Sequence, residues 1–128
     1  MSFSHRISVT DQRALLDCGS LGQLTELQTA LGSLLGEARF QSSFGLLVEL
    51  GQDGPIVECT HALAVADAFN VHRDQLQGRI ALHATDEHGG VAALYIAMIG
   101  RHHGLRMEAF RERGGAVAWL GGVADGSA

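Results

Sequence analysis

The chain has 128 residues, of which 46% are hydrophobic and 18% are charged, and its formal net charge is −5. This length suits one domain with a buried core, and the apolar runs stop well short of the roughly 20 residues that a membrane helix needs. The short apolar runs therefore predict no membrane span. The basic residues are nine scattered arginines without a lysine, so we do not expect a nucleic-acid partner.

The N-terminus and the cysteines favour a cytoplasmic protein. Residues 1–6 enter strand-like sequence at once, without the basic and apolar segments of a secretory signal. Cys18 and Cys59 form neither a CxxC pair nor a disulfide framework, so we expect reduced, packed thiols. Cys59 has a possible base in His61, but residues two apart on a helix do not face each other. No catalytic residue is therefore predicted, and we do not expect an enzyme.

The first forty residues predict a hairpin and then an amphipathic helix. Strand-like residues 5–10 and 14–17 are joined at Asp11 and Gln12. Ser20 and Gln23 fit a capping box that opens the helix. Its apolar positions recur at helical spacing: Leu24, Leu27, Leu31, Leu34 and Ala38.

Strand and helix patterns alternate along the rest of the chain. The apolar run 45–50 is typical of a strand covered on both faces, and a turn follows at 51–55. Thr60 can cap a helix that ends near Asn70. The later segments are a strand at 79–84, a loop at 86–90, a helix at 91–103 stopped by Gly104, a strand at 105–110, and a short helix ending at Trp119 and Leu120. In the helix at 91–103 we expect the stripe of Leu94, Tyr95, Met98 and Ile99 to face the core.

This order predicts an α/β fold with a mixed, mostly parallel sheet of about five strands and about four helices. Repeated strand–helix units give parallel strands, and the early hairpin adds an antiparallel one. Residues 1–120 should form a single domain and residues 121–128 a flexible tail.

The second half resembles the SpoIIAA-like branch of the STAS superfamily. Residues 79–86, followed by Gly90 at the opening of a helix, are similar to the family's strand, acidic loop and helix. Residues 107–112 and 116–120 look like its closing strand and short "AWL" helix. The resemblance implies the STAS fold and a binding or regulatory module without catalysis, which acts through protein contacts or a small ligand.

Thr60 is the regulatory candidate that this resemblance implies. STAS anti-sigma antagonists carry a phosphorylatable serine in an Asp-Ser-Ser context where a helix follows a central strand. The comparable stretch here, Glu58-Cys59-Thr60-His61, keeps a hydroxyl group without that pattern. Helix capping is the preferred interpretation of Thr60, and a phosphoswitch is the alternative.

The loop at 86–90 is the candidate ligand site. Asp86, Gly89 and Gly90 stand where a parallel strand meets a helix N-terminus, a common location for ligands in α/β folds. His83, Asp86 and His88 are also the closest set of potential metal ligands. Structural zinc sites usually have four ligands at recognisable spacing, so the predicted cofactor and metal content is none, and a small enzyme or metal protein is the alternative function.

The hydrophobic content also predicts self-association. With 46% hydrophobic residues in a short chain, we expect one apolar face to be buried in a symmetric homodimer. The identity of a protein partner or small ligand is not indicated by any motif.

Overall fold

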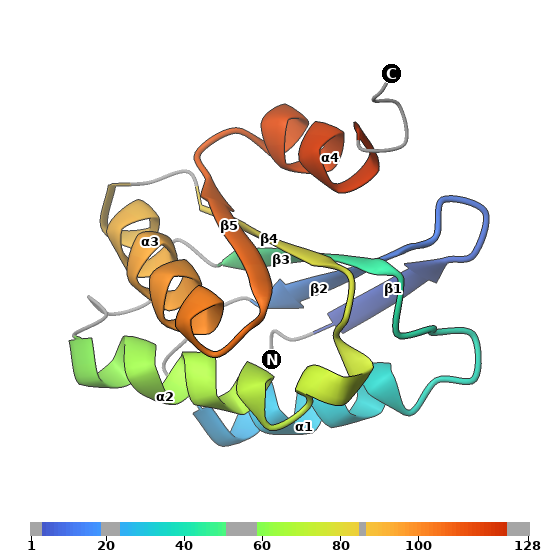
Figure 1. Ribbon diagram of the computed structural model, residues 1–128, viewed down its shortest axis with the longest axis horizontal. Coiled ribbons are helices and arrows are strands. Elements are labelled where there is room, and N and C mark those ends of the chain that lie inside the picture. The colour runs from blue at the N-terminus through green and yellow to red at the C-terminus, as the bar shows by residue number, and fades with distance from the viewer. Residues whose placement is uncertain (1–3, 19–23, 51–58, 85–86, 123–128) are drawn as a thin grey trace.

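The strands form one five-stranded sheet whose spatial order follows the chain, β1-β2-β3-β4-β5. The computed structural model describes residues 4–18, 24–50, 59–84 and 87–122 (Figure 1). β1 (Ser4–Ser8) pairs antiparallel with β2 (Arg13–Cys18). The other strands, β3 (Gly45–Leu50), β4 (Arg79–His83) and β5 (Arg106–Phe110), continue the sheet in parallel. The predicted α/β class and mixed sheet are confirmed.

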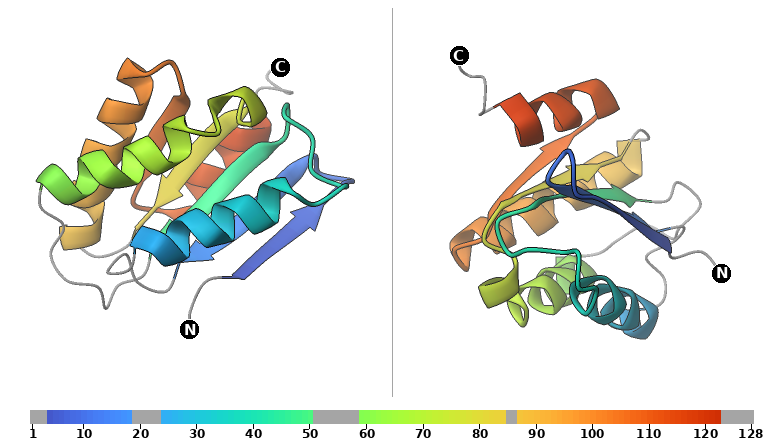
Figure 2. Two further views of the ribbon diagram at one scale, coloured as in Figure 1. Left: turned by 90° about the horizontal axis from the view of Figure 1, so that it is seen from below. Right: turned by 90° about the vertical axis from the view of Figure 1, so that its right-hand side faces the viewer.

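Three helices cover one face of the sheet and a fourth lies on the other (Figure 2). The three-helix layer consists of α1 (Leu24–Leu35), α2 (Cys59–Asn70) and α3 (Glu87–His102), with α2 between the other two. A short 3₁₀ turn, Arg73–Gln75, follows α2. α4 (Arg113–Gly122) packs over β3, β4 and β5. None of the helices in the described parts of the chain is long and apolar enough to cross a membrane.

The alternation of strand residues divides the core between the two faces. Leu46 and Val48 of β3 point into the main core beneath α1, α2 and α3, where Phe69 is also fully buried. Leu47 points to the opposite face and packs with Ala116 of α4. Because successive side chains of a strand alternate, residue 49 shares the α4 face with residue 47.

Trp119 holds α4 against the sheet. It packs against the smaller core on the α4 face. Its indole ring lies 5.6 Å from the Phe110 ring and 4.9 Å from the Arg79 guanidinium, measured to the ring centres. Arg79 also donates a hydrogen bond of 2.8 Å to the Trp119 carbonyl. α4 is thus fixed at its C-terminal part by a tilted contact between two aromatic rings, a cation–π contact and a charge-assisted hydrogen bond.

α3 departs from the sequence prediction in its start and in its buried face. It begins at Glu87, four residues before the predicted position 91, so Gly89 and Gly90 belong to the helix and not to a loop. The residues predicted to face the core are exposed or only partly buried: Leu94 is 61%, Tyr95 38% and Met98 53% exposed, and Ile99 is intermediate. The core side carries the smaller set Ala93, Ile96 and Ala97. A Cβ atom on Gly100 would collide with the Met107 side chain, so α3 packs closely against β5 at this residue.

Other boundaries differ by one turn or less. α1 ends at Leu35, so Ala38 lies beyond the helix and is exposed. The hairpin turns through Gln12, whose φ of +54° is unusual for a residue other than glycine. α4 continues to Gly122, past the predicted start of the tail at 121, and residues 123–128 lie outside the described part of the chain. The predicted stop of α3 is confirmed, since Gly104 has a φ of +93° two residues after the helix ends.

An ion pair ties the edge strand β1 to the segment that follows α1. His5 Nε2 lies 3.1 Å from Glu37 Oε2. The hydrogen bond from His5, and then that from Arg39, lower the pKa of the Glu37 carboxyl group below its ordinary value. Glu37 is therefore held as a carboxylate. It lies on the side of the sheet that α1, α2 and α3 cover, away from α4.

Candidate functional site

The site residues predicted from the sequence fall largely outside what the structure describes. α2 begins at Cys59, which makes Thr60 its second residue, but the Thr60 side chain lies outside the described part. Asp86 is also outside it, and Gly89 and Gly90 are described only as backbone of α3. The ligand-binding loop and the regulatory role of Thr60 therefore stay predictions.

One residue of the predicted metal set is well placed at the end of β4. His83 is 7% exposed, the one buried polar or charged residue among those described. It is the register partner of Glu49 in β3, and its Nδ1 lies 2.6 Å from Glu49 Oε1. Both side chains lie at the carboxyl ends of parallel strands, on the face that carries α4.

Glu49 joins this buried histidine to the first residue of α4. Its second oxygen, Oε2, lies 3.0 Å from Arg113 Nη1, an ion pair without hydrogen-bond geometry. A carboxylate only accepts hydrogen bonds, so His83 Nδ1 is the donor in this contact. His83 Nε2 is buried and has no hydrogen-bond partner among the described residues.

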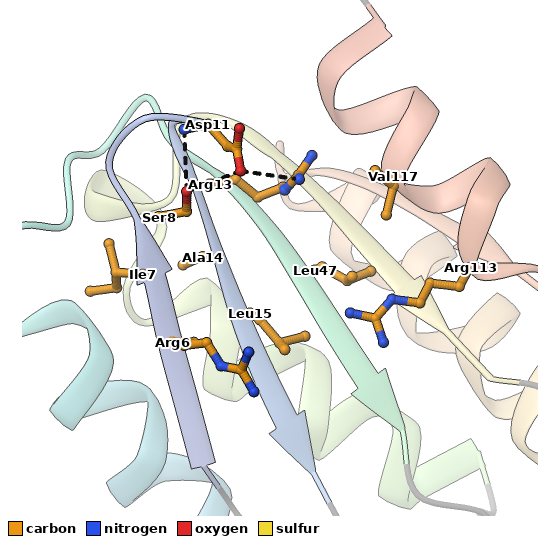
Figure 3. Close-up of a pocket in the computed structure, with 10 residues that line it drawn as sticks. All are labelled: Arg6, Ile7, Ser8, Asp11, Arg13, Ala14, Leu15, Leu47, Arg113 and Val117. Carbon is orange, nitrogen blue, oxygen red and sulfur yellow. Dashed lines mark hydrogen bonds and ion pairs between the residues drawn. The ribbon is translucent and has the colours of Figure 1, made fainter.

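Beside this network, a groove runs over the part of the sheet that α4 leaves uncovered (Figure 3). Its volume is about 170 Å³. Its apolar floor comes from β2, β3 and α4, through Leu15, Leu47 and Val117. The complete lining is Arg6, Ile7, Ser8, Asp11, Arg13, Ala14, Leu15, Leu47, Arg113 and Val117.

Three arginines from three different elements line this groove. Arg6 is on β1, Arg13 on β2 and Arg113 on α4, and Figure 3 shows their side chains around the apolar floor. Arg13 Nη2 is 3.7 Å from Asp11 Oδ2, a long and solvent-exposed ion pair. Arg113 is bound to Glu49, whereas Arg6 forms no ion pair with any residue that the structure describes. The groove thus concentrates positive charge in a protein of net charge −5.

Sequence reasoning missed this groove because its arginines are far apart in the chain. The hairpin register places Arg6 opposite Leu15 and Ser8 opposite Arg13, so both arginines reach the same face. Arg113 joins them because β5 is followed by a helix that returns across the other side of the sheet. The available signal was the alternation within the hairpin, which predicts that residues 6, 13 and 15 share a face once the pairing is known.

The structure does not test the predicted metal set. Within the described ranges no three His, Cys, Asp or Glu side chains come close enough to hold a metal ion. However, Asp86 and the His88 side chain lie outside those ranges. Convergence of His83, Asp86 and His88 therefore stays a hypothesis.

Comparisons with protein-family models, curated proteins and solved structures found no match to the chain. The fold and the groove are accordingly the observations from which a function can be argued.

Proposed function

We propose that this protein is a non-catalytic binding module of STAS-like architecture that takes a small anionic ligand with an apolar part. The observation that carries the proposal is the convergence of Arg6, Arg13 and Arg113 around an apolar floor. The resemblance in residues 79–86, 107–112 and 116–120 supports the regulatory context, and a cytoplasmic location and a homodimer belong to the same proposal.

The charge of the groove favours a phosphate or carboxylate group. Guanidinium groups match the oxygens of these anions with two parallel hydrogen bonds, and such charge-assisted bonds are among the stronger ones in proteins. Arg6 has no ion-pair partner among the described residues, so binding an anion there displaces no carboxylate of the protein. The ligand's charged end should therefore lie between Arg6 and Arg113.

The floor and volume of the groove limit the rest of the ligand. Leu15 and Leu47 offer an apolar surface between the arginines. The volume of the groove is about 170 Å³. This is below the roughly 300–1,000 Å³ of sites for drug-sized molecules, so a short chain of a few carbons fits best.

Calorimetric titration with butyl phosphate tests this proposal. We expect butyl phosphate to bind more tightly than inorganic phosphate, because only the former covers the apolar floor. Arg6→Gln and Arg113→Gln should each weaken binding about tenfold or more, since a hydrogen bond to a charged group contributes roughly 1.5–3 kcal/mol. Arg39→Gln, which changes an exposed arginine paired with Glu37 at 3.4 Å, is the matched control. Equal binding by all three variants would contradict the assignment of the groove.

The alternative function, a metal protein or small enzyme, has one specific observation in its favour. A histidine that donates Nδ1–H to a carboxylate and offers Nε2 is the arrangement usual for metal-bound histidines, and His83 with Glu49 has it. Zinc titration of the tag-free protein would then show binding that both His83→Gln and Asp86→Asn weaken, with His72→Gln as control. Zinc binding that His83→Gln leaves unchanged would exclude this site.

A further inference from the structure

The outer side of α3 carries an apolar stripe that nothing in the described protein covers. Its members recur at three- and four-residue spacing, which places them on one side of the helix. They are Val91, Leu94, Tyr95 and Met98, exposed by 47%, 61%, 38% and 53%. α3 stands at the end of the helical layer, with α2 on one side of it only (Figure 2). These four residues form the α3 stripe.

We propose that the α3 stripe is the interface of a two-fold homodimer in which α3 packs antiparallel against α3 of a second copy. This arrangement specifies the proposed homodimer and does not depend on ligand binding in the groove. A two-fold interface must be complementary to itself, because the same patch is used by both subunits. The stripe meets this condition. α3 spans residues 87–102, so its midpoint lies between Leu94 and Tyr95, and Val91 and Met98 are equally far from that midpoint.

This symmetry fixes the register of the dimer. An axis through the midpoint of α3 brings Leu94 and Tyr95 of the two copies together. It also sets Val91 of each copy against Met98 of the other. Met98 is unbranched and has several rotatable bonds, so it can fill the space left by the shorter valine.

The charges at the ends of α3 favour the same antiparallel arrangement. The helix begins with Glu87, and its last turn contains Arg101 and His102. Antiparallel packing sets the basic end of each helix beside the acidic start of the other and opposes the two helix dipoles. Arg101 is already bound to Glu108 at 2.6 Å, which leaves His102 as the exposed basic residue of the last turn.

The size of the apolar surface indicates a weak dimer. A standard stable interface buries roughly 800 Å² on each partner, more than four partly exposed side chains supply. We therefore expect a dissociation constant on the order of 10–100 μM, which corresponds to reversible assembly.

Sedimentation velocity of the full chain from micromolar to millimolar concentration tests the proposal. The wild type should shift from monomer to dimer across this range, and Leu94→Glu should remain monomeric while circular dichroism shows a folded protein. Val9→Glu changes a residue that is 52% exposed in the hairpin turn, and it should dimerise as the wild type does. A wild type that stays monomeric, or dimers that survive Leu94→Glu, would overturn the proposal.

The register has its own test, which also separates a second copy from any other partner. Val91→Glu and Met98→Lys should each block self-association, because each places two charged side chains against apolar ones. An equimolar mixture of the two variants should form a heterodimer, since one contact becomes a Glu–Lys pair and the other remains Val91 against Met98. A mixture that stays monomeric while the wild type dimerises would show that this register is wrong.

Discussion

Gly78→Ala is expected to lower the free energy of unfolding by roughly 2–4 kcal/mol, the largest effect of any single methyl group that we foresee. A Cβ atom at residue 78 would collide with the Phe44 carbonyl oxygen and lie 2.7 Å from that of Ser43. Both are backbone atoms, so no side-chain rotation relieves the contact. Gly78 also donates a hydrogen bond of 3.1 Å to the Ser42 carbonyl, which holds the entry of β4 to that of β3.

Urea denaturation of Gly78→Ala beside Gly32→Ala provides the measurement. Gly32 lies in α1 with nothing within 4 Å of an added Cβ atom. Gly32→Ala should therefore stabilise the protein by up to about 1 kcal/mol through helix propensity. If the free energy of unfolding of Gly78→Ala lies within about 0.5 kcal/mol of the wild-type value, the close approach of the two backbones is not rigid.

The second large effect should come from the Glu49–His83 pair. Glu49→Leu leaves the buried Nδ1–H of His83 without its acceptor, and His83→Leu removes one of the two groups that bind the Glu49 carboxylate. Each substitution should cost about 2 kcal/mol, because a buried polar group that loses its partner is penalised by roughly 1–3 kcal/mol. The double variant should be about 1 kcal/mol more stable than the sum of the two single losses predicts, because it leaves no buried N–H group without an acceptor.

A double-mutant cycle by chemical denaturation measures this coupling. Arg113→Gln is the control for the ion pair between Glu49 and Arg113. The Arg113 side chain is 57% exposed, so losing its ion pair should cost less than about 1 kcal/mol. Strict additivity of Glu49→Leu and His83→Leu would mean that the 2.6 Å contact between them does not contribute to stability.

The sequence predicts the fold well where local signals agree, and it fails at α3, where they conflict. The strand run at 45–50 coincides with the observed β3. At α3, Gly89 and Gly90 indicate a loop, yet the helix passes through both. Glycine costs a helix about 1 kcal/mol, and the packing of the long helix that continues from them outweighs that cost.

The buried face of α3 could not be read from periodicity. Helical spacing shows which residues share a side, but α3 is apolar on two sides. The larger side chains, such as Leu94 and Met98, suggest the core, whereas the buried residues are Ala93, Ile96 and Ala97. Which side is buried depends on the distance between elements, and that distance is a tertiary property.

The candidate site is equally beyond the sequence, for a topological reason. The sequence indicates His83 as a possible ligand, but its partner Glu49 lies 34 residues away and is brought to it only by the register of β3 and β4. Arginines scattered along the chain give no sign of a positive patch. Pairing in the hairpin and the return of α4 collect three of them in one groove.

The position of α4 has a consequence for when the groove forms during synthesis. The five strands pair in the order in which they leave the ribosome, and α1, α2 and α3 are made between them. Arg113 and Val117 emerge only after β5 is complete. A nascent chain that ends before Arg113 therefore already contains all five strands and α1, α2 and α3. Its groove lacks the side that α4 supplies, and Glu49 lacks its ion-pair partner Arg113. The groove is in this sense completed last.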